Sequence, residues 1–413
     1  MTTGQLNRNM RWNNINGILS TLANNMVGPF LGIFAISLGA SDSQIAALSS
    51  WPALVSLFAM IPGARFVDSF PRKKKLVAIF QALNRVFFVG LAFLPTIIVS
   101  ADKRPAVLVA AVALMNLPGA IANVSWQSFI GGIIPPERRA EAFAKRNQLM
   151  GACGAVASLI AGRIMGVLRF PVGYQVMFLV GFLLALLEIA SLLQINEGEA
   201  EPATVTHQKK PLGFAAFLKE AKTRPQYYRF AAASLVFHFG WQMGWPLFTK
   251  FQVQELLATP QWVSLFGVCS TLGSTLAYPV WSKFSTQKGN RYMLTIAAGA
   301  LALTPLFYAT STALWMLAVW SMVMGVSLAG IILLLFNTLL EVCPIEGRTQ
   351  YIAYHNTATS VTAVLAPYVG IYCVSQFGLR GALIATSVAR SVGAAAFVYV
   401  FLTSQRKLGR RAD

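Results

Sequence analysis

The sequence is poor in charged residues. Of its 413 residues only 33 are Lys or Arg and 14 are Asp or Glu, which is 11% of the chain, whereas soluble domains carry about 25%. Hydrophobic residues make up 56% of the chain, and a soluble globule cannot hide that much apolar surface. This composition excludes a soluble enzyme, a disordered chain and a disulfide scaffold, and it predicts a protein that lies in a lipid bilayer.

Cysteine, histidine and nucleotide-binding motifs are also scarce. The cysteines lie in apolar runs without a C-x-x-C pair, which favours reduced packing residues over a metal or redox role. The three histidines are far apart and no H-E-x-x-H motif is present, so we expect neither an enzyme nor a bound cofactor or metal. The chain has no Gly-Lys pair, which excludes the phosphate-binding loop of an ATP-driven pump.

Apolar runs long enough for a bilayer-spanning helix, which needs about 20 residues, are separated by Pro, Gly and charged residues. The predicted spans are residues 13–38, 44–65, 75–99, 105–134, 143–168, 173–195, 227–252, 261–284, 291–311, 313–343, 350–376 and 380–403. The sequence therefore predicts an all-α integral membrane protein with twelve transmembrane helices.

Lys and Arg are distributed unequally between the connections. The side that holds both termini carries 25 of the 33 basic residues, including Lys145 and Arg146 near the start of the fifth span, and the opposite connections carry 5. Because cytoplasmic loops are enriched in Lys and Arg, both termini are predicted to be cytoplasmic. The net charge of +19 then has a topological origin, so no nucleic-acid partner is expected.

The two halves of the chain repeat one another. Pro29 in the first span and Pro246 in the seventh are 217 residues apart, and Pro135 after the fourth span and Pro344 after the tenth are 209 residues apart. Repeats of this kind are typical of secondary transporters. We predict an N-terminal six-helix bundle over residues 1–195, a cytoplasmic linker with a short interfacial helix over 196–225, and a C-terminal six-helix bundle over 226–413.

The connection between the second and third spans, residues 64–73, places Asp68 shortly before a basic pair, Arg72 and Lys73. Residues 282–291, between the eighth and ninth spans, form a degenerate second copy. These paired loops resemble the G-x-x-x-D-R-x-G-R-[RK] motif of the major facilitator superfamily, although both glycines and the first arginine of the motif are replaced in the first copy.

The resemblance implies the fold of that superfamily, two pseudo-symmetric six-helix bundles, and secondary transport across the cytoplasmic membrane. It implies that Asp68 latches onto the start of the eleventh span, where free N–H groups and the helix dipole favour a carboxylate. Basic residues at the ends of several spans complete the predicted gating set: Arg72, Lys73, Arg139, Arg291 and Arg348. The alternative is that these basic residues only follow the positive-inside rule.

Polar and aromatic side chains at helical spacing mark candidate walls of a substrate cavity. In the seventh span His238, Trp241, Gln242 and Trp245 share one helix face. Candidates in other spans are Asn24, Asn25, Asn116, Asn123, Gln127, Asn337, His355 and Asn356. Aromatic and amide walls without a central charge suit a neutral or amphipathic solute. The alternative is that these side chains are hydrogen-bonding links between helices.

Coupling to protons requires a titratable side chain within the spans. Glu188 in the sixth span is the carboxylate that lies away from the span ends, and Arg85 in the third span lies at a similar depth. The two form either a static structural pair or a proton-coupled switch. His238 is the competing candidate, because histidine titrates near neutral pH.

The sequence therefore predicts a secondary active transporter that moves a small organic solute, neutral or amphipathic, by alternating access with proton coupling. The alternative is a facilitative uniporter, or an exporter of lipid-like molecules or drugs, of the same fold. The fifth span lacks the Gly-Pro pair that is typical of drug exporters in the resembled family. We expect a monomer in the inner or plasma membrane, with the solute, membrane lipid and protons as its partners.

Overall fold

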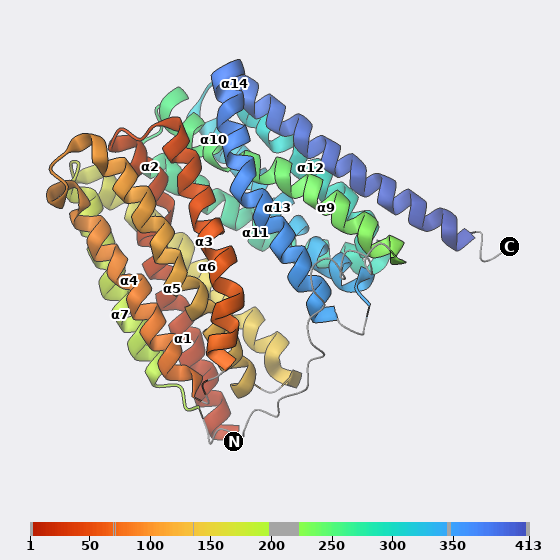
Figure 1. Ribbon diagram of the computed structural model, residues 1–413, viewed down its shortest axis with the longest axis horizontal. Helices are drawn as coiled ribbons and strands as arrows, with labels where there is room; N and C mark the ends of the chain where they lie inside the picture. The colour runs from red at the N-terminus through yellow and green to blue at the C-terminus, as the bar shows by residue number, and fades with distance from the viewer. Residues whose placement is uncertain are drawn as a thin grey trace. The chain divides into compact units, whose positions relative to one another are not determined.

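The computed structural model describes residues 3–68, 70, 72–134, 136–197, 223–344 and 348–409. For some helical residues in these ranges, among them Asp68, Arg139 and Arg348, only the backbone is described. The described chain is almost entirely helical and contains no strand (Figure 1). Most of the predicted linker, with its interfacial helix, lies outside the described residues.

The chain divides into two compact units. The N-terminal unit comprises Met1–Thr204 and Ala258–Val268, and the C-terminal unit comprises Val205–Leu257 and Cys269–Asp413. The boundaries predicted from the sequence, 1–195, 196–225 and 226–413, stay a prediction.

In the N-terminal unit the predicted spans correspond to long helices. The elements are α1 (Thr3–Val27), η1 (Gly28–Phe30), α2 (Leu31–Ser37), α3 (Asp42–Asp68), α4 (Lys73–Ile97), η2 (Ala101–Lys103), α5 (Arg104–Ile133), α6 (Pro136–Val167) and α7 (Val172–Leu193). Helix α1 packs against α6 and α7, while α4 packs against α5 and α7. The interior of this unit therefore lies around α1, α4 and α7.

The C-terminal unit has the corresponding series. Its elements are α9 (Pro225–Met243), α10 (Trp245–Lys250), η3 (Phe251–Glu255), α11 (Pro260–Lys288), α12 (Asn290–Thr310), α13 (Leu314–Val342) and α14 (Arg348–Gly409), although the first residues of α11 belong to the N-terminal unit. Helix α14 is interrupted at Gly378, where φ is 69°, a conformation that glycine adopts without steric cost. Its two halves correspond to the eleventh and twelfth predicted spans.

The first and seventh spans are both interrupted at a proline. Pro29 lies in the short helix η1, which separates α1 from α2, and Pro246 is the second residue of α10, which follows the end of α9. Proline lacks an N–H and its ring clashes with the preceding turn, so it breaks the hydrogen-bond ladder of a helix. The repeat seen in the sequence is thus a repeat of local structure, with the same irregularity in both copies.

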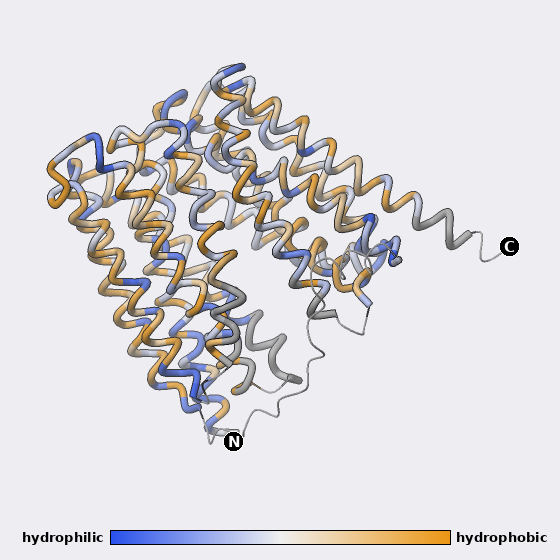
Figure 2. The backbone as a smooth tube through the Cα atoms, in the orientation of Figure 1, coloured by the Kyte–Doolittle hydropathy of each residue, from blue (hydrophilic) through white to orange (hydrophobic). Residues whose placement is uncertain are grey.

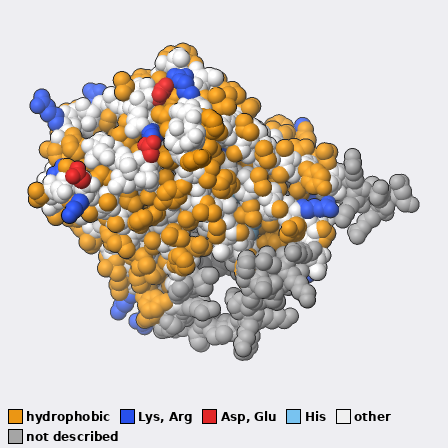
Figure 3. Space-filling view, turned by 45° about the horizontal axis from the view of Figure 1, so that its top comes forward, with side chains coloured by type: hydrophobic (Ala, Val, Ile, Leu, Met, Phe, Trp, Pro, Cys, Tyr) orange, Lys and Arg blue, Asp and Glu red, His pale blue; other side chains and the backbone are white. Residues whose placement is uncertain are grey.

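The helices have the surface expected of membrane spans. Nine helical runs among the described residues are long and apolar enough to cross a membrane, and one of them, Tyr354–Thr403, includes both halves of α14. Large apolar side chains such as Leu276 and Trp315 are exposed. Figure 2 shows hydrophobic residues along the helices, and Figure 3 shows an outer face that is mainly apolar with few charged side chains. Such a surface suits contact with lipid.

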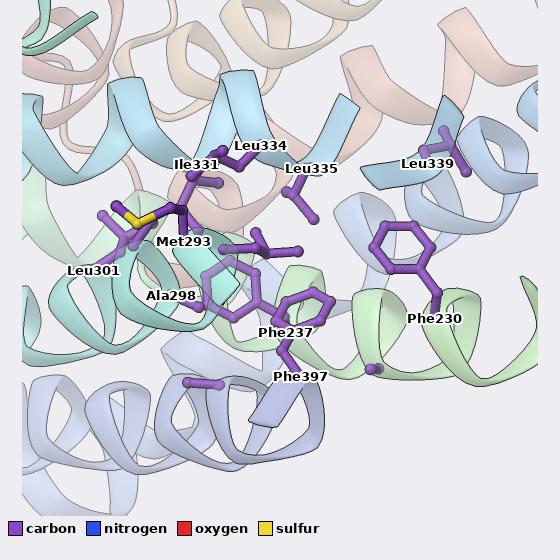
Figure 4. Close-up of a cluster of buried hydrophobic side chains, with 14 of the residues drawn as sticks. Phe230, Phe237, Met293, Ala298, Leu301, Ile331, Leu334, Leu335, Leu339 and Phe397 are labelled. Carbon is purple, nitrogen blue, oxygen red and sulfur yellow. The ribbon is translucent and has the colours of Figure 1, made fainter. Parts of the chain in front are cut away.

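A hydrophobic cluster fills the interior of the C-terminal unit. Phe230 and Phe237 from α9 pack with Phe397 from α14 and with apolar residues of α12 and α13 (Figure 4). Helices α9 and α14 approach closely at Gly393, where a Cβ atom would lie 2.5 Å from the Cα atom of Phe237. Small residues of this kind allow the close helix packing that stabilises membrane bundles.

Candidate functional site

An ion pair lies in the interior of the N-terminal unit. Arg85 Nη2 of α4 is 3.0 Å from Glu188 Oε2 of α7, and Arg85 Nε donates to the same oxygen at 3.2 Å. Glu188 is 0% exposed and Arg85 is 7% exposed. The two residues that the sequence placed at similar depth are therefore in direct contact, and their charges compensate each other away from water.

Amide side chains complete the hydrogen bonding of this pair. Gln81 Nε2 donates to Glu188 Oε1 at 3.2 Å, and Asn24 Oδ1 accepts from Arg85 Nη1 at 2.8 Å. Asn16 Nδ2 donates to the backbone carbonyl of Glu188 at 3.0 Å. Asn24, predicted to bind substrate, is thus engaged by the ion pair, and the group as a whole ties α1, α4 and α7 together.

A second cation, Arg146, is buried in the same unit. It lies on α6 with 9% of its surface exposed, and its guanidinium carbon stacks 4.4 Å from the ring centroid of Trp126. Its Nε donates to the backbone carbonyl of Asn13 at 3.3 Å, and the space is available because residue 17 is a glycine, whose Cβ would lie 2.6 Å from Arg146 Nε. Arg146 was predicted from the sequence as one of the basic residues near the start of the fifth span, and the structure adds that its side chain is buried.

In the C-terminal unit two histidines meet through a serine hydroxyl. Ser234 Oγ lies 3.2 Å from His238 Nδ1 and 3.4 Å from His355 Nε2. His238 Nδ1 is also 2.8 Å from the carbonyl oxygen of Ser234, and a carbonyl only accepts, so Nδ1 carries the hydrogen. Ser234 Oγ then accepts from His238 and donates to His355 Nε2, an assignment that rests on the hydrogen-bond pattern.

The predicted aromatic stripe on the seventh span is only partly assembled. His238 contacts Trp241 with ring centroids 5.6 Å apart, and Trp241 contacts Trp245 at 6.4 Å. Gln242 instead is buried and bonds to α14, donating to the Thr359 carbonyl at 3.3 Å and accepting from Thr362 Oγ1 at 2.6 Å. The structure therefore groups His238 with the two tryptophans and gives Gln242 a contact between helices.

Amides of the first and fourth spans make mainly local hydrogen bonds. Asn25 Oδ1 accepts from Ser158 Oγ at 2.7 Å, which links α1 to α6. Asn116 donates to a carbonyl of its own helix. Asn123 and Gln127 are exposed and lie 3.4 Å apart, with Gln127 as donor. The side chains of Asn123 and Gln127 are thus exposed, whereas Asn25 and Asn116 have internal hydrogen-bond partners.

Asn337 lies apart from the histidine and tryptophan group. It donates to Asn290 Oδ1 at 3.3 Å, Asn290 in turn donates to Glu341, and Glu341 lies 3.6 Å from Arg291 Nε. This polar group joins the start of α12 to the end of α13. It therefore brings a predicted substrate residue, Asn337, to a predicted gating residue, Arg291.

The predicted gating loop contacts the end of α7 through its backbone. The N–H groups of Lys73 and Lys74 donate to Glu197 Oε1 at 2.7 and 3.1 Å, which places a carboxylate at the N-terminus of α4, where the helix dipole favours it. Lys74 Nζ donates to the Ile195 carbonyl at 3.0 Å. Arg72 is exposed. The side chains of Asp68, Arg139 and Arg348, and with them the predicted latch, lie outside the part of the chain that the structure describes.

Arg390, which is 1% exposed, has a capping role that was not predicted from the sequence. Its guanidinium donates to the carbonyls of Gly240, Trp241 and Leu301 and to Thr304 Oγ1, at 3.0 to 3.2 Å. Gly240 and Trp241 belong to the last turn of α9, whose carbonyls have no helical partner. The Leu301 carbonyl lacks a backbone N–H partner because the residue four positions later is a proline, and it also accepts from Thr304 Oγ1 at 2.8 Å. Pro305 was the signal in the sequence for this site, because a proline within a helix leaves a carbonyl without its backbone partner.

A stripe of buried asparagines on α1 was also not predicted from the sequence. Asn9, Asn13 and Asn16 are each 1% exposed and recur at the i, i+4, i+7 spacing of one helix face. Both side-chain polar atoms of Asn13 are buried without a hydrogen-bond partner in the described structure. The spacing was visible in the sequence, but it lay within the polar N-terminal segment.

In the described residues no group of three His, Cys, Asp or Glu is arranged to hold a metal ion.

Comparison with known proteins identifies the family. The profile of the Major Facilitator Superfamily matches residues 14–253 and 230–413. A comparison with curated proteins found no match. Similar solved structures include a mutant form of the nucleoside transporter NupG, with TM-score 0.72, 14% identity and coverage of 94% of this chain and 100% of that chain.

Two further structures have the same fold. A bacterial homolog of the human lysosomal transporter Spinster, inward-facing and unoccupied, has TM-score 0.70, 14% identity and coverage of 97% and 98%. The peptide transporter POT in complex with sulfate has TM-score 0.72, 14% identity and coverage of 97% and 94%. With the apolar helices described above, these matches confirm the predicted fold class and a multi-pass helical membrane protein.

Proposed function

Because the chain belongs to the Major Facilitator Superfamily, we propose that it is a secondary active transporter that moves a small organic solute by alternating access, with proton coupling. The observation that carries the proposal is the hydrogen-bonded line from His238 through Ser234 Oγ to His355. Titratable side chains within spans are costly, and in transporters they mark proton pathways. Here His238 contacts Trp241, which in turn contacts Trp245.

The line of donors and acceptors is suited to passing a proton. When His238 Nε2 takes a proton, the Nδ1 hydrogen can pass to Ser234 Oγ while the hydroxyl hydrogen passes to His355 Nε2. His355 then carries hydrogen on both ring nitrogens and holds the added charge, while His238 is neutral with its hydrogen on Nε2. Only N–H and O–H bonds form and break. Trp241 contacts His238, so a solute that displaces this ring also changes the surroundings of the titrating nitrogen.

The Arg85–Glu188 pair is proposed to be structural. Each oxygen of Glu188 already accepts a hydrogen bond, from Gln81 or from Arg85, and the carboxylate is 0% exposed. Protonation of Glu188 would leave the Arg85 charge buried and unpaired, which is strongly unfavourable. Of the three coupling candidates, the geometry therefore favours His238.

The solute is proposed to be neutral or amphipathic and to carry a ring. Trp241 and Trp245 offer ring faces in the C-terminal unit. Nucleosides and peptides, named for two transporters of similar fold, belong in the first panel of test solutes.

The distribution of Lys and Arg supports an inner or plasma membrane orientation with both termini in the cytoplasm. A monomer is proposed as the working unit, with residues 1–195 and 226–413 as its two bundles and 196–225 as the linker. The alternative function, facilitative uniport or export of a lipid-like molecule or drug, is kept as an outcome of the experiment below.

The test is transport by the purified protein in liposomes under an imposed pH gradient, with a lumenal pH dye and radiolabelled solutes. We expect solute uptake to move protons, and His238→Gln to abolish proton movement. His355→Gln should weaken the coupling. His207→Gln, a histidine in the predicted linker, is the matched control and should behave as the wild type. Solute movement without proton movement would support uniport instead, and loss of proton movement in Glu188→Gln alone would assign coupling to the ion pair.

A further inference from the structure

A small pocket lies at one end of the C-terminal unit, separate from the histidine line. It is formed where α9 and α12 begin and where α13 and α14 end, so four helix ends surround it. Its volume is about 30 Å³. The residues that line it are Pro225, Gln226, Arg229, Phe230, Arg291, Thr338, Val342, Val400 and Thr403. A pocket of this size admits one small group of a larger molecule, whose remainder lies along the protein surface.

The pocket combines apolar walls with a basic rim. Phe230, which belongs to the hydrophobic cluster of Figure 4, lines it together with Val342 and Val400. Arg229 and Arg291 also line it. An apolar wall next to cations suits a molecule with both an apolar and an anionic part.

The net charge around the pocket is positive. Arg291 donates to Gln226 Oε1 at 3.4 Å and lies 3.6 Å from Glu341 Oε2, a carboxylate that is 41% exposed. Arg229 makes no ion pair within the part of the chain that the structure describes. The charges of Arg291 and Glu341 compensate each other, so the positive charge of Arg229 has no counter-charge among the described residues.

A buried hydroxyl in the pocket needs an acceptor. Thr338 is 2% exposed, lines the pocket, and its Oγ1 has no hydrogen-bond partner in the described structure. Leaving a buried polar group unsatisfied costs about 1–3 kcal/mol. An oxygen of an inserted ligand would accept the hydrogen of this hydroxyl, which is an observation independent of the arginines.

We propose that this pocket binds an anionic phospholipid. Arg229 and Arg291 hold the phosphate, Thr338 donates to an oxygen of the glycerol or phosphate group, and Val342 and Val400 contact the start of an acyl chain. The apolar walls favour lipid over free phosphate, since inorganic phosphate gains nothing from them. The position also fits, because basic side chains at the ends of membrane helices lie at the level of lipid headgroups.

The experiment is a binding titration of the full-length protein in detergent, followed by thermal shift and native mass spectrometry. Phosphatidylglycerol, phosphatidylcholine and inorganic phosphate are compared. We expect phosphatidylglycerol to bind at least about tenfold more tightly than phosphatidylcholine, and Arg229→Gln to remove about tenfold of that affinity, since one charge-assisted hydrogen bond is worth about 1.4 kcal/mol or more. Thr338→Val should weaken binding by about threefold.

Two comparisons keep the test decisive. Arg380→Gln, a half-exposed arginine elsewhere in the same unit, is the matched control and should bind phosphatidylglycerol as the wild type does. Arg229→Lys retains the charge and should fall between the wild type and Arg229→Gln. Equal binding of both lipids, or unchanged binding in Arg229→Gln, would overturn the proposal. Equal protection by inorganic phosphate would make this a site for a soluble anion instead.

Discussion

In the N-terminal unit an ion pair and amides link α1, α4 and α7, whereas the equivalent positions in the C-terminal unit carry apolar side chains. Helix α4 begins at residue 73 and α12 at residue 290, which is the same offset of 217 that relates Pro29 to Pro246. The equivalent residues are Gln81 and Ala298, Arg85 and Ala302, Asn16 and Ala233, and, at the offset of 209, Glu188 and Phe397.

The apolar residues at these equivalent positions show that the repeated helix arrangement does not depend on the ion pair. The apolar members, such as Phe397 and Ala298, are almost fully buried and pack in the cluster of the C-terminal unit. Replacement of a buried ion pair by well-packed apolar residues is often neutral or stabilising. The charges of Arg85 and Glu188 are therefore a feature of one unit, which specifies how its helices pair, and are not a requirement of the fold.

A second set of equivalent positions also differs between the two units. Arg146 is equivalent to His355 and Gly17 to Ser234 at the same two offsets. In the N-terminal unit the glycine leaves room for the permanently charged guanidinium, and in the C-terminal unit the serine hydroxyl reaches the histidine. One unit thus holds a fixed cation where the other holds a group that titrates.

Breaking the ion pair on one side should destabilise the protein most. Arg85→Met leaves the Glu188 carboxylate buried without its cation, and we expect a loss of about 3–5 kcal/mol in the free energy of unfolding. The double variant Arg85→Ala with Glu188→Phe, which copies the C-terminal unit, should recover most of that loss. Unfolding of the purified protein in detergent measures both. A double variant no more stable than Arg85→Met would show that the two interiors are not interchangeable.

A smaller loss in the free energy of unfolding is expected when Arg390 of the C-terminal unit is replaced. Arg390→Met removes the donor that satisfies three carbonyls and Thr304 Oγ1, and we expect a loss of about 2–3 kcal/mol. Arg380→Met is the matched control, because the Arg380–Glu255 pair is largely exposed and such pairs contribute about 0–1 kcal/mol. If both variants lose the same amount, capping of the α9 end is not what Arg390 provides.

Removal of the hydroxyl between the two histidines should change stability least. Ser234→Ala should cost about 1 kcal/mol in the free energy of unfolding, the usual net contribution of one hydrogen bond. Ser327 is also buried but donates within its own helix at 3.0 Å, so Ser327→Ala should cost less. Equal losses in the two variants would mean that His355 does not depend on Ser234.

Patterns local in the sequence predicted the helices well. The apolar runs indicated the spans, and Pro29 and Pro246 marked the places where the first and seventh spans are interrupted. The depth of Arg85 and Glu188 also indicated their contact.

Contacts between helices were less predictable. The stripe on the seventh span suggested a single wall, but Gln242 bonds to α14 while Trp241 contacts His238. Adjacent positions differ by about 100° around a helix, so small rotations decide which neighbour each side chain meets. Arg146 was predicted from its charge alone to lie near a span end. Its burial depends on Gly17 of the facing helix, which leaves room for the guanidinium.

Hydropathy and proline act within one helix, so the membrane environment, the spans, their interruptions and the repeat could all be read from the amino-acid order. Which side chains meet depends instead on the packing of separate helices. Ser234 and His355 are 121 residues apart and Arg85 and Glu188 are 103 apart, and their contacts require particular rotations of the helices that carry them. That packing is set by the sum of many side chains on both helices, and it placed an ion pair in one unit at positions that are apolar in the other.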